Sequence, residues 1–553
     1  MISQYRFSWI KSGNPWVWLT AGAVSISLIS VLGLLLLIGW KGLVYFWPAP
    51  LYQWQDSQGQ RLIGQVYQRD YVSLDQLSEQ SRQWPESAVS AGQVARLSIK
   101  VANRDIYSQD FISVLAMDLH HQETPSDLAV FERTRGGDFF GQPIAFESQN
   151  KTYRGSLATH IEIALQDGNA VRDQIDEILQ GELYSATKQL DSLRNEQRLK
   201  QNKGQVNPEA LKAFQLQQKT LETRFNAAEK KILTLQQQLS SQRVLVKDMR
   251  GEVIALPLDS LLDAWYPNAM NWKEKIQHWG KQVMKFILDN PRESNSEGGV
   301  FPAIFGTVLL VIIMSVVVMP LGVIAAVYLH EYARDTMLTR LIRISVVNLA
   351  GVPSIVYGVF GLGFFVYTLG NSIDELFYSD SLPTPTFGTP GLLWSAMTLA
   401  ILTLPVVIVA TEEGLARVPN SARHGSYALG ATKFETLWRI VLPMVSPAIM
   451  TGLILAVARA AGEVAPLMLV GVVKLASNLP VDGDFPYLHL ERKFMHLGFH
   501  IYDVGFQTPN IEAARPLVFA TSFLLITVVV GLNITAIMIR NNLREKFKIL
   551  GND

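Results

Sequence analysis

Six long apolar runs dominate the pattern of hydrophobic and polar positions along the chain. Each run is long enough to cross the hydrocarbon core of a bilayer as a helix, which takes about 20 residues. Because backbone polar groups in lipid must be satisfied within the segment itself, we predict membrane-spanning helices. One run stands alone near the N-terminus and five lie in the second half of the chain: residues 17–39, 303–329, 344–370, 391–410, 446–473 and 516–539.

Basic residues are unevenly distributed between the two sides of these runs. The connection 371–390 contains no Lys or Arg, whereas the connections on the other side and the tail are basic. By the positive-inside rule, both termini and the loop 411–445 are expected in the cytoplasm and the segment between the first two spans outside. The basic side chains are Arg334, Arg340, Arg343, Arg417, Arg423, Lys433, Arg439, Arg540, Arg544, Lys546 and Lys548.

The long segment between the first two spans has the composition of a soluble domain. Alternation in QGQRLIGQVYQRDYVSL and LAVFERTRGGDFFGQPIAF predicts strands, the second stretch with a turn at Gly136 and Gly137. Further on, apolar residues recur with 3,4 spacing in two stretches separated by the breakers Gly204 and Pro208. This predicts an antiparallel coiled-coil hairpin over about 172–242, either packed on its own domain or reaching a partner. The recurring positions are Leu179, Leu183, Ala186, Leu190 and Leu193, then Leu211, Phe214, Leu221, Phe225, Ala228, Ile232, Leu235 and Leu239.

Composition and absent motifs exclude several classes of function. The chain carries 48 basic and 48 acidic side chains, so no net charge favours nucleic acid, and it has no cysteine for disulfides or thiolate metal sites. It lacks the GxxxxGK[ST] phosphate loop, the HExxH zinc motif and the GxSxG nucleophile motif. We therefore expect no enzyme and no ATP hydrolysis by this chain. His489, His496 and His500 lie in an outer loop, and His496 and His500, four residues apart, are expected to be solvated histidines rather than metal ligands.

Two charged residues fall inside the fifth apolar run. Arg459 and Glu463 are predicted near the middle of 446–473, where lipid exposure of an Arg costs roughly 2.5–3.5 kcal/mol. At i,i+4 they can simply neutralise each other. Alternatively, Arg459 lines a solute path and offers its guanidinium to an oxyanion, with Glu463 holding it in position. Gly462 and Pro466 would permit close helix approach and a break in the helix.

The cytoplasmic loop before this run predicts two short helices. Residues 420–430 form the first, with Gly430 as the left-handed residue that ends it. Phe434, Leu437, Trp438 and Val441 then make an apolar stripe suited to the membrane interface, and Pro443 is expected to start the turn into the span. On these patterns alone the loop is an amphipathic anchor or a docking element for a cytoplasmic partner.

Four stretches carry a resemblance to a known family. Gly430, followed at the family's spacing by Ile440, Leu442 and Pro443, resembles the EAA loop of ABC importer permeases, although His424, Gly425 and Ser426 stand where that family has Glu-Ala-Ala. Together with this loop, EGGVFPAIFGT, NLAGVPSIVYGVFGLG and ARAAGEVAPL (297–307, 348–363 and 458–467) are similar to phosphate-specific permease subunits of the PstA type. The second string contains the helix 3 signature of Gly351, Pro353 and Ser354.

The resemblance covers about residues 297–545 and implies an ABC importer type I core there. Together with the hydropathy pattern, we expect a mainly α, polytopic membrane protein with six transmembrane helices and a large α/β periplasmic insertion that contains the coiled-coil hairpin. The expected organisation is a cytoplasmic N-terminus (1–16), a first transmembrane segment (17–46), a periplasmic domain (47–296), a permease core (297–545) containing the coupling loop 411–445, and a cytoplasmic tail (546–553). Residues that would contact the ATPase are Arg423, His424, Gly425, Ser426, Ala428, Leu429, Gly430, Ala431 and Thr432.

The resemblance also implies partners and a substrate. Ile440, Leu442 and Pro443 would act as the lever that joins the ATPase contact to Arg459. The expected partners, in the bacterial inner membrane, are a second permease of the PstC type, a PstB-type ATPase dimer that binds ATP and Mg, and a periplasmic phosphate-binding protein of the PstS type. This chain itself would hold no cofactor. Alternatives are a permease for another oxyanion, the PstC-type role, or a membrane scaffold or sensor with a periplasmic coiled-coil arm.

Overall fold

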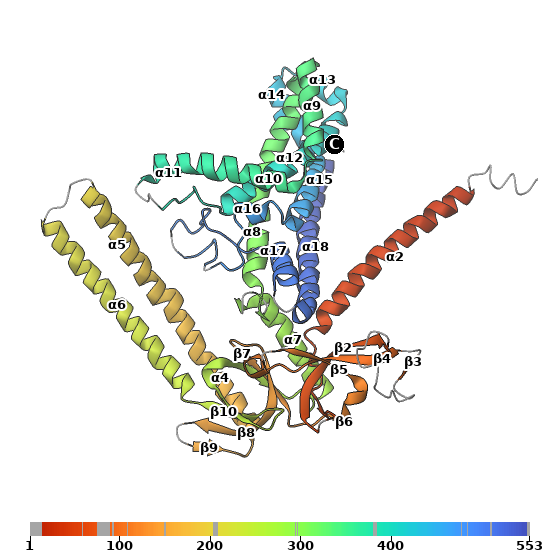
Figure 1. Ribbon diagram of the computed structural model, residues 1–553. Coiled ribbons are helices and arrows are strands. Elements are labelled where there is room, and N and C mark those ends of the chain that lie inside the picture. Colours follow the sequence, from red (N-terminus) through yellow and green to blue (C-terminus); the bar gives the residue numbers. More distant parts are fainter. Residues whose placement is uncertain are drawn as a thin grey trace, which may run out of the picture. The chain divides into compact units, whose positions relative to one another are not determined.

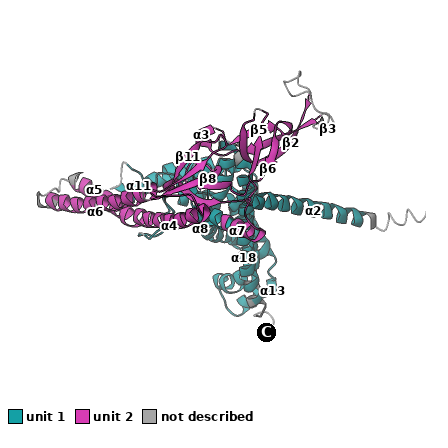
Figure 2. Ribbon diagram, turned by 90° about the horizontal axis from the view of Figure 1, so that it is seen from below, with its two compact units in different colours: residues 1–46, 283–553 teal, residues 47–282 magenta. Residues whose placement is uncertain are grey.

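The computed structural model divides the chain into two compact units, residues 1–46 with 283–553 and residues 47–282 (Figure 2). The second boundary therefore falls within a helix, earlier than the predicted 296. The structure describes residues 14–57, 59–74, 89–90, 93–107, 109–148, 151–202, 208–292, 295, 297–379, 384–476, 478–483, 485–508 and 511–549. Gly204, most of the predicted N-terminal segment and the last four residues of the tail lie outside this range.

The first unit contains six helical stretches long and apolar enough to cross a membrane, as predicted. They are Trp16–Val44, Phe301–Tyr332, Ser354–Phe377, Leu392–Ala416, Lys433–Gly462 and Ala514–Asn542. The helices of this unit are α2 (Asn14–Val44), α8 (Phe301–Val327), η6 (Tyr328–Tyr332), α9 (Met337–Leu349), α10 (Ser354–Phe360), η7 (Gly361–Gly370), α11 (Asn371–Phe377), α12 (Leu392–Ala416), α13 (Asn420–Ala428), α14 (Lys433–Thr436), η9 (Leu437–Val441), α15 (Leu442–Gly462), α16 (Leu467–Val470), α17 (Leu497–Tyr502), η10 (Asp503–Gln507) and α18 (Ile511–Ile549).

Two predicted spans are displaced along the chain. The third was predicted at 344–370, but the backbone breaks between α9 and α10 and the span is Ser354–Phe377. Pro353 explains the break, because a proline disfavours helical backbone in the residue before it. The fifth was predicted at 446–473, but it begins at Lys433 and ends at Gly462. Hydropathy located the apolar stretch in both cases, whereas caps and prolines determine where the helix begins and ends.

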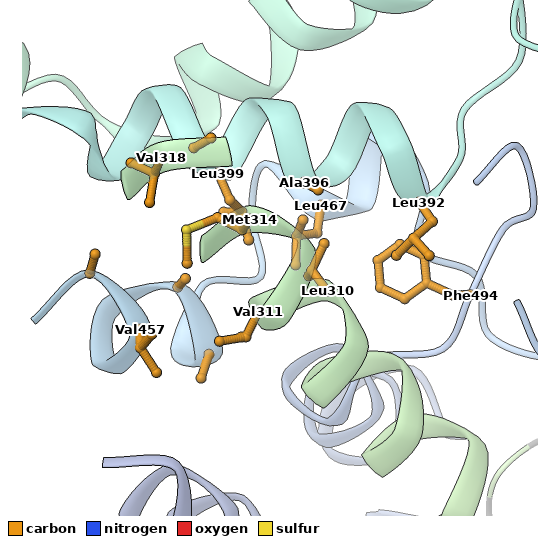
Figure 3. Close-up of a cluster of buried hydrophobic side chains, with 14 of the residues drawn as sticks. Leu310, Val311, Met314, Val318, Leu392, Ala396, Leu399, Val457, Leu467 and Phe494 are labelled. Atoms are coloured by element: carbon orange, nitrogen blue, oxygen red, sulfur yellow. The ribbon is translucent and has the colours of Figure 1, made fainter. Parts of the chain in front are cut away.

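The core of this unit lies where α8, α12 and α15 pack together. Leu310, Met314 and Val318 of α8 interdigitate with Leu392, Ala396 and Leu399 of α12, and Val457 and Leu467 close the cluster (Figure 3). α15 contributes Ala456, Ala460 and Ala461, all fully buried. In a membrane, helices associate through van der Waals packing, and small side chains such as these let their backbones approach closely. The helix that carries Arg459 is therefore held firmly against α12.

The second unit contains two antiparallel sheets. One has the strand order β3-β4-β2-β1-β6, with β5 also paired to β4, and the other has the order β11-β10-β8-β7-β12, with β9 paired to β8. The strands are β1 (Tyr52–Gln55), β2 (Arg61–Ser73), β3 (Val89–Ser90), β4 (Gln93–Lys100), β5 (Phe111–Leu115), β6 (His120–Glu123), β7 (Ala129–Arg133), β8 (Phe139–Ser148), β9 (Lys151–Tyr153), β10 (Arg243–Lys247), β11 (Val253–Pro257) and β12 (Leu261–Trp265).

The strand predictions agree with these sheets. QGQRLIGQVYQRDYVSL contains β2, and LAVFERTRGGDFFGQPIAF contains β7 and β8. Between the latter two strands, Gly136 and Gly137 have φ of +80° and +74°, backbone conformations that glycine adopts at little cost. The predicted turn is therefore present where the sequence placed it.

Two long helical arms run side by side in the second unit (Figure 1). The first consists of α4 (Leu157–Ile178), η3 (Leu179–Leu183) and α5 (Tyr184–Asn202), and the second is α6 (Pro208–Ser240). Ile161 and Leu165 of α4 join the core of the second sheet. Farther along, predicted seam residues Ala186, Leu190, Phe214 and Ala228 are buried. The base of the arms thus packs on its own domain, and a coiled coil remains a prediction.

Candidate functional site

The segment after α12 forms a short helix with a tightly closed end. α13 runs from Asn420 to Ala428 and stops at Gly430, whose φ is +84°. The N–H of Gly430 donates to the carbonyl of Tyr427 at 3.0 Å, and the N–H of Ala431 donates to the carbonyl of Ser426 at 3.2 Å. These two bonds are the Schellman arrangement, which requires a left-handed residue. Gly430 therefore ends the helix as its position predicted.

A second pair of contacts fixes the start of the next helix. The Thr432 side chain accepts from the N–H of Glu435, and the Glu435 carboxylate accepts from the N–H of Thr432 at 2.9 Å. This capping box satisfies two backbone donors at once. In addition, the buried hydroxyls of Ser426 and Thr436 lie 2.8 Å apart and tie α13 to α14. The Thr-x-x-Glu pattern was visible in the sequence and would have placed the helix start at Lys433.

A buried ion pair holds this segment against the end of α8. Arg423 donates to the Glu331 carboxylate at 2.9 Å and to the Leu415 carbonyl at 2.9 Å. The two charged side chains are only 13% and 11% exposed. Lys433 also donates to the Glu331 backbone carbonyl and lies 4.5 Å from the centre of the Tyr332 ring. Glu331 therefore joins both sides of the Gly430 turn to the second span, a role that no sequence pattern indicated.

The residues expected to contact an ATPase fall into two groups. Ser426 is buried, and Arg423 points inward to its partners. Leu429, by contrast, is 91% exposed at the tip of the turn. The exposed members, which present one surface around the end of α13, are His424, Gly425, Ala428, Leu429, Gly430 and Thr432.

One continuous helix leads from this turn into the membrane. α14, η9 and α15 follow each other without a break from Lys433 to Gly462, hereafter the long helix. The predicted turn at Pro443 is therefore wrong. The helix passes through Pro443 directly after the π-helical turn Leu437–Val441, where the regular backbone hydrogen bonding is already interrupted. π-helical turns occur as single-turn bulges within helices, where they shift the backbone hydrogen bonding.

The predicted apolar stripe on the long helix is also divided. Leu437 and Val441 are buried against Leu415 and Val418 in a cluster at the end of α12. Phe434 and Trp438 remain more than 60% exposed and stack on each other, with ring centres 6.3 Å apart. The lever residues Ile440, Leu442 and Pro443 lie partly buried between these two faces. One face of the helix is thus packed inside the unit and the other is free for lipid or a partner.

Arg459 and Glu463 lie at the end of the long helix rather than at the middle of a span. Arg459 is in its last turn, and Glu463 is the C-cap with extended backbone. The Arg459 Nε and Glu463 Oε1 atoms are 3.6 Å apart, and the two side chains are 31% and 21% exposed. The helix ends at Gly462 and leaves the last eleven residues of the predicted run, 463–473, outside it. The pair is therefore loosely held and accessible.

The break after the long helix is packed against the third span. A Cβ on Gly358 would lie 2.7 Å from the Pro466 Cα, so only glycine permits this approach of α10. Gly462, by contrast, faces open space, and its predicted role in close packing is not supported. Gly351, Pro353 and Ser354 form the break between α9 and α10, which the Tyr357 hydroxyl bridges by donating to the Leu349 carbonyl at 2.6 Å.

The three histidines of the outer loop are buried, contrary to the expectation for His496 and His500. Burial lowers the pKa of His496 and of His500 to about 4, so both rings are neutral at pH 7. The His496 Nδ1 accepts from the N–H of Gly498 at 3.1 Å. His489 lies between Asp482, at 2.9 Å, and Glu491, at 3.1 Å. His496 is the N-cap of α17 and His500 lies within that helix, whereas the contacts of His489 come from its own loop.

Comparison with known proteins defines the class. Residues 318–545 match the family "Binding-protein-dependent transport system inner membrane component". "Phosphate transport system permease protein PstA 1" of Mycobacterium tuberculosis (strain CDC 1551 / Oshkosh) is 33% identical over 312 residues, which are 56% of this chain and 91% of that protein. "Phosphate transport system permease protein PstA" of Yersinia pestis is 36% identical over 189 residues, 34% of this chain and 58% of that one.

These matches identify the membrane subunits of binding-protein-dependent ABC importers as the class. Within it, the chain belongs to the family of ABC transporter permeases of the PstA type. Such a subunit is not an enzyme, because a separate ATPase hydrolyses ATP. Among solved structures, "Inward facing conformations of the MetNI methionine ABC transporter" aligns with a TM-score of 0.32 and 18% identity over 44% of this chain and 94% of that one, a score too low to carry an argument.

Proposed function

We propose that this chain is the membrane-spanning permease subunit of an ATP-driven importer for inorganic phosphate. It would form half of the translocation path, together with a second permease of the PstC type. A PstB-type ATPase dimer would bind ATP and Mg below it, and a periplasmic PstS-type protein would deliver phosphate. The printed names of the relatives in Mycobacterium tuberculosis and Yersinia pestis support phosphate as the substrate.

The observation that carries this proposal is the continuity of the long helix. It begins beside the Gly430 turn and ends at Arg459 and Glu463. At 1.5 Å per residue, Lys433 and Arg459 are about 40 Å apart along it. A rigid element of this length transmits a displacement of α13 to the far end of the span. ATP-driven closure of the ATPase dimer would thereby reorient the pair.

The chemistry of Arg459 suits an oxyanion. A guanidinium presents a planar fork of donors that matches phosphate oxygens, and it stays charged at any working pH. Glu463 at 3.6 Å competes for this fork, so the anion is held weakly enough to be released. The partial exposure of both side chains leaves room for an ion to reach them. Phosphate would then pass from the outside to the cytoplasm.

Uptake of labelled phosphate by three variants tests the anion role. In Arg459→Gln, uptake is expected to be lost although the complex assembles, because the oxyanion has no donor fork. Arg340→Gln, an exposed arginine on α9, is the matched control and should retain uptake. The double variant Arg459→Gln with Glu463→Gln separates the two interpretations of the pair.

If the pair only neutralises its own charges, removing both charges restores transport. If Arg459 binds the anion, the double variant stays inactive. Normal uptake by Arg459→Gln, or recovery in the double variant, would therefore refute a direct role of Arg459 in the anion path.

A further inference from the structure

The helix α7 (Trp272–Leu288), which precedes the second span, exposes a ridge of large apolar side chains. Trp272, Ile276, Met284 and Leu288 are 70%, 47%, 54% and 56% exposed. They follow one another at intervals of four residues, with Gly280 at the remaining position. Residues four apart are neighbours on a helix surface, and each such step turns by about 40°, so these side chains form a ridge that rises about 24 Å and covers an arc of about 160° around the helix. A contiguous apolar surface of this kind on a folded protein marks a binding surface.

The other side of α7 is firmly packed, so the ridge is not the result of a frayed helix. Phe286 is 5% exposed and belongs to a core cluster of the first unit. Earlier in the helix, the Lys281 ammonium lies 2.8 Å from the Asp263 carboxylate. The His278 ring lies 4.6 Å from that of Trp265. Each half of the helix is thus packed within its own unit, and its apolar ridge remains exposed.

Contacts of Phe286 place this end of α7 at the membrane boundary. The Phe286 ring lies 5.1 Å from that of Phe46, two residues beyond the end of α2. The Phe286 carbonyl accepts from the N–H of Val300 at 2.8 Å, and α8 begins at the next residue. Two membrane spans therefore end beside Phe286. Met284 and Leu288, which flank it in sequence, are therefore close in the chain to the ends of two candidate spans.

The residues around the helix are those that favour a membrane interface. The Trp47 ring lies 5.1 Å from that of Trp272, and the Tyr45 ring lies 5.0 Å from that of Phe46. Tyr and Trp are enriched at the level of lipid headgroups, where one end of the ring is apolar and the other wet. Lysines outnumber acidic residues on α7, which carries Lys273, Lys275, Lys281, Lys285 and Glu274. This excess of positive charge suits anionic phospholipids.

We infer that α7 is an interfacial membrane helix whose apolar ridge lies in the headgroup region of an anionic phospholipid bilayer. This surface is separate from the coupling loop 411–445 and from Arg459, and the inference does not depend on which side of the membrane the second unit occupies. Docking at this depth would fix the chain ahead of α8, since α7 ends at Leu288 and that span begins at Phe301.

Labels at single cysteines test this inference, because the chain contains no cysteine of its own. We would prepare Ile276→Cys and Met284→Cys in the full chain with its accompanying subunits. The matched control is Lys219→Cys, an exposed position on α6. Each carries an environment-sensitive nitrobenzoxadiazole label in nanodiscs containing phosphatidylglycerol, with or without a lipid that bears a nitroxide near its headgroup.

The labels at 276 and 284 are expected to emit at shorter wavelength and to lose at least about half of their fluorescence to the nitroxide lipid, as for a helix buried at the headgroup boundary. The label at 219 should be quenched by iodide in the water and not by the lipid. Iodide quenching without lipid quenching at 276 and 284 would overturn the inference. Protection of both labels from both quenchers would also overturn it, because a protein partner would then cover the ridge.

Discussion

The ion pair between Arg423 and Glu331 is expected to hold α13, in the coupling loop 411–445, against the end of the second span. Replacing Glu331 by Gln removes the charge but keeps an acceptor for the Arg423 fork. A hydrogen bond to a charged group contributes about 1.5–3 kcal/mol. Arg423 keeps its bond to the Leu415 carbonyl, so we expect the lower end of that range. The free energy of local opening of α13 should therefore fall by about 1.5 kcal/mol, which accelerates amide exchange roughly tenfold.

Hydrogen exchange of the peptide 420–429 in nanodiscs measures this effect, and a double-mutant cycle isolates the pair. Glu331→Gln should accelerate exchange roughly tenfold in the native background. In an Arg423→Gln background it should have almost no effect, because the partner is already absent. The Asp335–Arg340 pair is the control, since both of its side chains are about 70% exposed and it should show no coupling to α13.

The cycle also defines the result that would refute this reasoning. If Glu331→Gln accelerates exchange equally in both backgrounds, the two residues act independently and the ion pair does not hold the segment. If Asp335→Asn has the same effect as Glu331→Gln, the change reflects general loss of negative charge rather than a specific buried contact.

Three further predictions concern the turn and the outer loop. Gly430→Ala forces alanine into a left-handed conformation and should destabilise the end of α13 by about 1–2 kcal/mol. Gly425→Ala, inside α13, should stabilise that helix by about 1 kcal/mol. Hydrogen exchange of the peptide 420–429 should therefore become faster in the first variant and slower in the second, and equal changes would contradict this. Leu429→Asp should leave folding intact, because the side chain is 91% exposed, but should reduce co-purification of the ATPase; normal co-purification and uptake would argue against docking there. Burial lowers the pKa of His496 and His500 from about 6.5 to about 4, so the stability that depends on their neutral forms is complete above pH 6.5 and is lost as the pH falls towards 4. Thermal unfolding measured across this pH range should show the loss, and His500→Gln should make it smaller. The same pH dependence in His500→Gln as in the unaltered chain would contradict this.

The sequence predicted the membrane unit well wherever length and hydropathy decide. Six spans need only enough apolar residues, and a left-handed helix end needs only Gly430 at the right position. Helix ends were less predictable. Pro443 indicated a stop, yet the helix continues through it, directly after the π-helical turn Leu437–Val441. The capping box of Thr432 and Glu435 was the local signal that would have corrected this boundary.

Long-range contacts could not be predicted in the same way. Glu331 is ninety-two residues from Arg423, and nothing in the spacing joins them. The burial of His496 and His500 depends on α8, α17 and α18, which come together only in the folded unit. For Arg459, the residue type indicated oxyanion chemistry, but the position within the span depended on where the helix ends. The chemistry of a residue could therefore be predicted from the sequence, whereas its position along the span and its contact partners in the fold could not.

The central claim is that this chain belongs to an importer of inorganic phosphate. Cells depleted of the chain and then complemented with it provide the most direct test, by uptake of labelled phosphate and labelled sulfate at equal concentrations. We predict that depletion abolishes high-affinity phosphate uptake, that complementation restores it, and that sulfate uptake is unchanged. Unchanged phosphate uptake after depletion, or loss of sulfate uptake instead, would contradict the claim.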